Sequence, residues 1–249
     1  MESSLLRQIR VLQACVLVLF LSTTLLAINL VHPLLPMQRF KLIEAQKVNI
    51  REEDGVLKGS LSNAAGFKVF GRAQQDVTFS GLMFYNEEGE EAGGLVYEGK
   101  AIPGGQRASA GLTFDQYRQD QNIYLHHDEH KDAQGFSISD GLSVMARPDF
   151  TGGKEEYQIY NRIDQLPPEQ RDDASLKAVQ AGKVSSPRVF LGVRRGVKNS
   201  SPYDDSGVFI RNKWGRSAIK LYVDNENKPH FEVYDSLGKS MVYELKIPK

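Results

Sequence analysis

Residues 77–97 read VTFSGLMFYNEEGEEAGGLVY, and this stretch decides the fold class. Residues 77–85 and 93–97 are apolar and rich in the residue types that favour β-strands. Between them, residues 86–89 (NEEG) combine an asparagine, two acidic residues and a glycine, which is typical of a tight turn. The stretch therefore predicts an antiparallel β-hairpin.

The same order of strand, polar turn and strand recurs along most of the chain. Apart from this hairpin, we expect strands at 48–50, 56–61, 110–117, 122–125, 135–139, 189–193, 207–211, 218–224, 229–234 and 241–245. We predict that residues 40–249 form an all-β domain, an antiparallel meander of hairpins packed as a sandwich, a barrel or a small propeller-like assembly. Residues 164–182 interrupt the meander with prolines near a helix start, early acidic residues and a closing glycine, which predicts one surface helix.

The amino-terminal region carries a second signal. Residues 11–31 contain no charged side chain and are close to the roughly 20 residues that cross a bilayer as a helix. We predict a tail at 1–10, a transmembrane anchor at 11–31 and a linker at 32–39. A cleaved signal peptide and a buried helix are the alternatives, but the end of the apolar run offers no good cleavage site. Arg7 and Arg10 favour a cytoplasmic amino terminus, with the main domain outside the cytoplasm at a bacterial inner membrane.

Composition excludes several classes of protein. The 249 residues include 31 basic and 31 acidic side chains, so the formal net charge is zero and nothing suggests a nucleic-acid partner. The single cysteine, Cys15, excludes an internal disulfide framework and a cysteine-based zinc cluster. The chain has no GxSxG, HExxH or paired CxxC motif, and we expect no cofactor.

The densest polar cluster is residues 126–130, HHDEH. On a strand, His126, Asp128 and His130 would share one face, because side chains alternate. Two imidazoles and a carboxylate at this spacing could bind zinc or another divalent ion. The alternative is the solvated tip of a hairpin.

A second candidate is residues 114–121, FDQYRQDQ, read as a regular strand. Its polar face would offer amides, a carboxylate and an aromatic ring to a sugar or to a partner chain. The alternative is a hydrogen-bonded packing network. The predicted ligand-binding residues, including two from the preceding hairpin, are Asn86, Glu88, Asp115, Tyr117, Gln119 and Gln121.

Four stretches, in this order, resemble a family of bacterial proteins that has no established function: 48–63, 81–100, 112–121 and 219–239. The motifs that carry the resemblance are the FYNxEGxExGGLxY hairpin and the FDQYxQDQ segment. The resemblance implies a bacterial source and a β-rich domain that often follows an apolar amino-terminal segment. It implies no catalytic residues, and residues 126–130 are not part of the shared motif.

These observations favour a membrane-anchored, extracytoplasmic protein that binds a protein or glycan partner in the cell envelope. One alternative is a cell-envelope hydrolase that uses a carboxylate pair or a metal ion. Another is a structural subunit of an envelope complex, in which the anchor helix packs against other helices.

Overall fold

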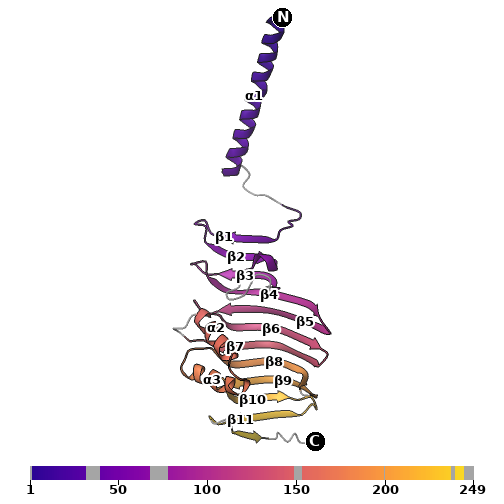
Figure 1. Ribbon diagram of the computed structural model, residues 1–249, viewed down its shortest axis with the longest axis vertical. Coiled ribbons are helices and arrows are strands. Elements are labelled where there is room, and N and C mark those ends of the chain that lie inside the picture. The colour runs from indigo at the N-terminus through magenta and orange to yellow at the C-terminus, as the bar shows by residue number, and fades with distance from the viewer. Residues whose placement is uncertain are drawn as a thin grey trace. The chain divides into compact units, whose positions relative to one another are not determined.

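The computed structural model describes residues 2–31, 40–67, 78–148, 153–198, 200–236 and 239–243. The chain divides into two compact units, Met1–Glu44 and Ala45–Lys249, which are described separately. The first consists mainly of helix α1 (Glu2–Val31), and the second contains a β-sheet and two further helices (Figure 1).

Helix α1 includes one segment, Arg7–Ile28, that is long and apolar enough to cross a membrane by length and composition. The hydroxyls of Ser22, Thr23 and Thr24 donate to backbone carbonyls one turn earlier, at 2.8–2.9 Å. These bonds satisfy the hydroxyls within the helix itself. The helix begins at Glu2, so most of the predicted tail is helical, and the predicted linker at 32–39 lies outside the described residues.

The second unit contains twelve described strands in a single sheet, which confirms the prediction of an antiparallel meander. The strands follow one another in chain order, and every neighbouring pair is antiparallel. They are β1 (Lys47–Arg51), β2 (Leu57–Ser62), β3 (Ser80–Tyr85), β4 (Glu91–Ile102), β5 (Gly105–Asp115), β6 (Gln121–Asp132), β7 (Gly135–Ala146), β8 (Ser186–Lys198), β9 (Ser201–Arg211), β10 (Ser217–Val223), β11 (Pro229–Tyr234) and β12 (Ser240–Tyr243).

A shared turn chemistry closes several of these hairpins. The side-chain oxygen of Asn86 accepts hydrogen bonds from the backbone N–H groups of Glu88 and Glu90, at 2.9 and 3.0 Å. Asn212 and Asp224 make the same pair of bonds in their own turns. An Asn or Asp side chain thus replaces a backbone acceptor, which explains why these short polar segments reverse the chain.

The pairing register shifts in several strand pairs, always near the strand ends that lie on the same side of the sheet. The shifts occur at Ile50/Arg51, Phe84/Tyr85, Phe114/Asp115, Val144/Met145 and Ser217/Ile219. At each shift, one strand of the pair has one more residue than its partner, and such bulges bend and twist a sheet locally. The long central strands are accordingly curved in Figure 1.

Two helices connect β7 to β8 where the sequence predicted one. Helix α2 (Gly153–Asp164) precedes the predicted segment, and α3 (Pro168–Gln180) lies within it. Pro167 lies between them and Pro168 is the first residue of α3, a position that tolerates proline because its N–H would have no partner within the helix. Both helices lie beside the bulged end of the central strands (Figure 1).

The described strands form one sheet with β1 and β12 at its edges. A closed barrel would pair these two strands, and a sandwich would need a second sheet; neither occurs among the described residues. Buried apolar side chains are correspondingly few in the described part of the chain: Phe67, Met83, Ile163, Val184 and Phe209.

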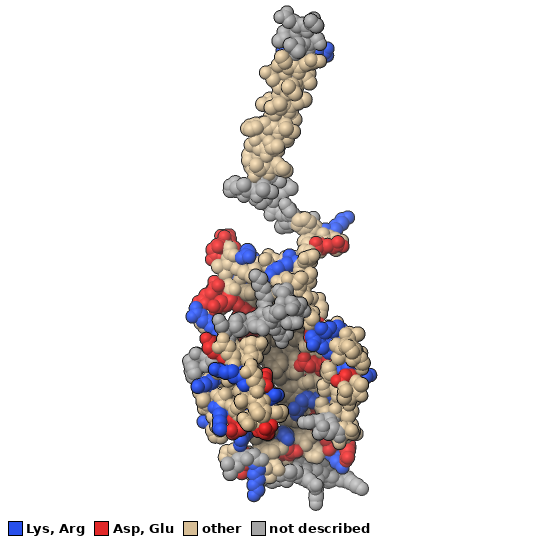
Figure 2. Space-filling model, viewed as in Figure 1, with Lys and Arg blue, Asp and Glu red and all other residues tan. Residues whose placement is uncertain are grey.

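The two faces of the sheet differ in composition. One face, the leucine face, carries a row of cross-strand partners that are nearly all aliphatic: Val48, Leu61, Leu82, Leu95, Leu112, Leu125, Leu142, Leu191, Val208, Leu221 and Phe231. The opposite face, the hollow face, carries glycines, aromatic rings and polar groups at the alternating positions. Figure 2 shows the sheet hollowed between the two helices and the opposite strand ends.

Candidate functional site

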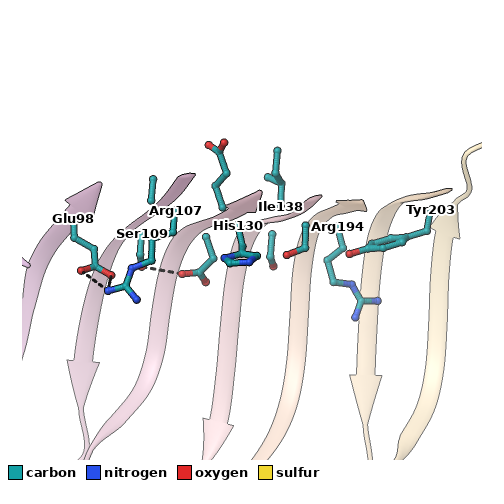
Figure 3. A pocket seen from close by; sticks show the side chains of 12 residues that line it. Glu98, Arg107, Ser109, His130, Ile138, Arg194 and Tyr203 are labelled. Carbon is teal, nitrogen blue, oxygen red and sulfur yellow. Dashed lines mark hydrogen bonds and ion pairs between the residues drawn. The ribbon is translucent and has the colours of Figure 1, made fainter. Parts of the chain in front are cut away.

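The hollow face contains a depression of about 400 Å³ over strands β4–β9. Its polar lining includes Glu98, Arg107, Ser109, His130, Arg194 and Tyr203. Figure 3 shows Glu98, Arg107 and Arg194 projecting from one side of the sheet, while Ile138 points to the other side. Side-chain alternation on neighbouring strands therefore collects these charged groups in one place.

Aromatic rings form a row along the floor of the hollow face. Successive ring centroids from His126 through Phe190, Phe209 and Tyr222 to His230 are 4.7–5.9 Å apart. Tyr124, a further member, lies 4.8 Å from His126. These spacings match the preferred separation of interacting aromatic rings.

Glycines make room for these rings. A Cβ added at Gly141 would lie 2.6 Å from the Phe190 ring, and one added at Gly207 would lie 2.6 Å from Tyr222 Cβ. Side chains at these positions would collide with the aromatic row. The row therefore depends on glycines from neighbouring strands, which is a typical use of glycine in a strand interior.

Arg194 is the outstanding charged group of this face. Its guanidinium carbon lies 4.0 Å from the centroid of Phe209 and 5.2 Å from that of Phe190. Among the described residues Arg194 forms no ion pair within 4.0 Å, and its Nε has no hydrogen-bond partner. Burial lowers the pKa of Arg194, but an arginine stays charged at neutral pH. The hollow thus holds a half-buried cation whose nearest acidic neighbour, the cross-strand partner Asp205, acts on it electrostatically without forming an ion pair.

The other arginine of the hollow is neutralised. Arg107 Nη2 lies 3.2 Å from a carboxylate oxygen of Glu98 and also donates to Thr78 Oγ1 at 3.3 Å. Thr78 in turn bonds to Glu98. This closed group fixes one wall of the depression and leaves Arg194 as the cation available to a ligand.

A chain of polar side chains crosses the floor from Ser109 to Ser143. Ser109 Oγ donates to Asp128 Oδ1 at 2.8 Å, and Asp128 Oδ2 lies 2.8 Å from His126 Nδ1. His126 Nε2 lies 3.3 Å from Ser143 Oγ. The order Asp–His–Ser has the connectivity of a hydrolase triad, but Ser143 is only 7% exposed. It sits on a central strand that pairs on both sides, with Tyr124 and Phe190, so the ladder occupies the backbone N–H groups that an oxyanion hole would need.

The predicted metal ligands share a face, but each histidine bonds to a different carboxylate. His126 pairs with Asp128, and His130 Nε2 lies 3.0 Å from Asp132 Oδ2. Within the described ranges, no group of three His, Cys, Asp or Glu side chains is placed to hold a metal ion. The geometry instead shows two separate histidine–carboxylate pairs.

The prediction that residues 114–121 form a regular strand is wrong. β5 ends at Asp115 and β6 begins at Gln121, and the residues between them form a hairpin turn. Arg118 adopts a left-handed conformation there, with φ of 58°. Because no glycine occupies this turn, it carries no turn signal at the usual position.

Two of the predicted ligand-binding residues come together at neighbouring turns. Tyr117 Oη donates to Glu88 Oε1 at 2.7 Å, and Arg118 Nη2 donates to Glu88 Oε2 at 2.9 Å. These bonds join the β3–β4 and β5–β6 turns. Asn86 lies in the first turn, where its side chain holds the backbone.

The remaining predicted residues lie next to the segment that leads into α2. Gln119 Nε2 donates to the carbonyl of Pro148 at 2.8 Å, and the carbonyl of Gln121 accepts from Arg147 Nε at 2.8 Å. Partial burial and the charge of Asp120 raise the pKa of Asp115 to about 6. The contacts of this group are thus made largely within the protein.

Arg147 ties the same region to helix α2. It forms an ion pair with Glu156 at 3.0 Å, and the two side chains are only 8% and 4% exposed. Glu156 also accepts the backbone N–H of Ser185 at 2.7 Å. One buried carboxylate therefore holds α2 to the beginning of β8.

Comparison with protein-family models, with curated proteins and with solved structures finds no match for this chain.

The residues that distinguish the hollow were missed at the sequence level. Arg194, Phe190 and Phe209 come from β8 and β9, and their contacts depend on register. Residues 189–197, VFLGVRRGV, carry a weak signal. At every second position from Phe190 to Gly196 a bulky residue is followed by a glycine, and the two adjacent arginines fall on opposite faces.

Proposed function

We propose that this protein is a membrane-anchored binding protein of the bacterial cell envelope, and that the hollow face of its sheet binds an acidic saccharide. The observation that carries the proposal is Arg194, a half-buried cation that lies over the Phe209 ring and forms no ion pair within 4.0 Å among the described residues, although Asp205 lies opposite it on β9. A guanidinium offers paired donors that match a carboxylate. The ligand chemistry therefore includes a carboxylate group.

The surroundings of Arg194 favour a sugar as the carrier of that carboxylate. Serine hydroxyls at Ser137 and Ser139 border the depression and offer both donors and acceptors. Tyr203, which also lines the depression, provides an apolar ring face on which the C–H face of a pyranose can pack. A few placed polar groups beside apolar surface are typical of small-molecule sites.

The location rests on helix α1. Its apolar segment is long enough to span a bilayer, and Arg7 and Arg10 favour retention of the amino terminus in the cytoplasm. The sheet domain then lies outside the cytoplasm. Protease treatment of intact spheroplasts tests this arrangement: we expect the sheet domain to be digested, and protection would contradict it.

Binding is tested with two oligosaccharides of equal length, a galacturonate hexamer and a neutral maltohexaose. We expect the full-length protein in detergent micelles to bind the galacturonate and not the neutral sugar in calorimetry. Arg194→Gln should weaken binding at least tenfold, because a charge-assisted contact in a partly dry site contributes about 1.5–3 kcal/mol.

The matched control is Arg195→Gln. Arg195 is the next residue on β8, is exposed and points to the leucine face. Its substitution removes the same charge from the neighbouring position of the chain, but from the other face of the sheet. Equal losses in the two variants would show a diffuse electrostatic effect and contradict the proposed site. Equal affinity for the two sugars would contradict the acidic ligand.

A further inference from the structure

The leucine face is a broad apolar surface that no described element covers. Side chains along the main row remain about half exposed: Leu95 49%, Leu125 56%, Leu191 49% and Leu221 49%. A second row runs parallel to it and is also apolar throughout: Ile50, Gly59, Phe84, Gly93, Phe114, Ile123, Val144, Val189, Ile210, Ile219 and Val233.

The size of this surface is that of a protein interface. The rows cross eleven strands spaced about 4.8 Å apart, and two rows with their side chains span roughly 14 Å, which gives about 700 Å². Monomeric proteins rarely expose a contiguous apolar patch this large. A standard interface buries about 800 Å² on each partner, so one sheet of this size suffices.

The shape of the surface suits another sheet. Nearly every residue of the main row is leucine or valine, so the row has an even height across the strands. A sheet with one apolar face is normally covered by a second layer, and two sheets pack face to face about 10 Å apart. A second copy of the chain brings the same even surface and satisfies the isologous symmetry of a dimer.

The border of the leucine face distinguishes a protein partner from a lipid surface. Its exposed border residues carry both signs of charge, with Asp204 and Arg195 as examples, and His127 Nδ1 lies 2.6 Å from Asp140 Oδ1 on the same side. Bacterial lipid surfaces are anionic and attract a uniformly basic border. A border with charges of both signs suits a second copy of the chain, because positive groups on one copy can lie opposite negative groups on the other.

We propose that the protein forms a homodimer in which the leucine faces of two sheets pack against each other. The dimer is a sandwich made between two copies, so the second layer that one chain lacks is supplied by the other. The hollow faces point away from the interface and stay open, which makes this inference independent of the ligand proposed above.

Cross-linking in lipid vesicles tests the dimer in the presence of a membrane. The full-length chain carries Cys15→Ser and one new cysteine at Leu61, Leu125, Leu191 or Leu221. Sheets about 10 Å apart are beyond the reach of a disulfide, so a bis-maleimide with a reach of about 10 Å is used. We expect at least one position to give a band at twice the 27.9 kDa chain mass.

Ser137→Cys in the same background is the matched control, because Ser137 is exposed on the hollow face. We expect less than a tenth of the best leucine-face yield. Comparable yields at Ser137 would indicate random collision and overturn the proposal, as would the absence of dimer at all four leucine positions. A fluorophore on the same cysteines that is quenched by brominated lipid, without cross-linking, would show that the membrane covers this face and would also overturn it.

A second pair of substitutions tests the surface itself. Leu125→Glu with Leu191→Glu places two carboxylates in the centre of the row, and we expect a tenfold or greater loss of cross-linking at Leu221→Cys. Both positions are about half exposed in the single chain, so the circular dichroism of the sheet should not change. Unchanged cross-linking with intact β-structure would refute the interface.

Discussion

The two faces of the sheet are built from the same strands, yet they reverse the usual relation between polarity and burial. Ser143, on the hollow face, is 7% exposed, and the side chain of His126 is 10% exposed. Leu125, which precedes His126 on the same strand, is 56% exposed. Burial in this domain therefore follows the geometry of the face and not the hydrophobicity of the residue.

The physical cause is the crowding of side chains on the hollow face. Large rings there lie over the glycines of neighbouring strands, and the chain from Ser109 to Ser143 is hydrogen-bonded within itself. The leucine face has no such overlap, and its side chains stand apart in straight rows. A single sheet can thus bury polar groups on one side while the aliphatic side chains on its other side remain half exposed.

We expect the largest loss of unfolding free energy when the Glu156 carboxylate, which holds α2 to β8, is removed. In Glu156→Ala, the buried Arg147 guanidinium loses its closer carboxylate and keeps only Asp120 at 3.6 Å, and the N–H of Ser185 loses its acceptor. Removing one partner of a buried ion pair costs about 3–5 kcal/mol. We expect a loss of about 4 kcal/mol in the free energy of unfolding, measured by urea titration of the full-length protein in micelles.

The neighbouring residue supplies the control for that measurement. Glu155 is exposed in the first turn of α2, so Glu155→Ala should change the free energy of unfolding by less than about 0.5 kcal/mol. Similar losses in both variants would mean that helix propensity, and not the buried ion pair, fastens α2.

We expect the next largest loss of unfolding free energy when an aromatic side chain of the hollow face is truncated, and a smaller loss for an aliphatic side chain of the leucine face. Phe209 is 5% exposed and contacts the rings of Phe190 and Tyr222, whereas Leu191 is 49% exposed. Phe209→Ala should cost about 3 kcal/mol, since it opens a cavity in the aromatic row. Leu191→Ala should cost about 1 kcal/mol or less under conditions in which the protein is monomeric.

Denaturant titration of the two variants measures the comparison directly. If Leu191→Ala proved as costly as Phe209→Ala in the monomer, the leucine face would be covered within a single chain, and the contrast between the faces would fail.

The fold class was predictable because turn residues and alternating segments are local signals. The NEEG turn at 86–89 is such a signal, and the strands on both sides of it are confirmed. The β5–β6 turn was missed because Arg118, and not glycine, occupies the left-handed position. Helix α2 was also missed, although Tyr157, Tyr160 and Ile163 recur at nearly helical spacing within it.

The two faces could not be recognised from the sequence in the same way. An aliphatic row exists only after eleven strands are aligned in one register, and a slip of one residue on any strand would break it. The environment of Arg194 likewise depends on Phe209, which lies on the next strand. The contrast between the faces is thus a property of pairing, which local patterns do not contain.

The smallest expected effect is a dependence of stability on pH at the bulged end of the sheet. Burial and the nearby Asp120 raise the pKa of Asp115 from its ordinary 3.8 to about 6, although Arg147 lowers it somewhat. Between pH 4 and pH 6 the folded state therefore binds more protons than the unfolded state, so stability falls as the pH rises through this window. Asp115→Asn removes this contribution, and we expect its urea midpoint relative to the native chain to rise between pH 4 and pH 7.

Glu87 is the control, because a hydrogen bond from Lys58 lowers its pKa. The urea midpoint of Glu87→Gln relative to the native chain should therefore not rise over the same range. A midpoint difference for Asp115→Asn that stays constant across the window would mean that solvent reaches this carboxylate freely, and that the crowding of the hollow face ends before the bulges.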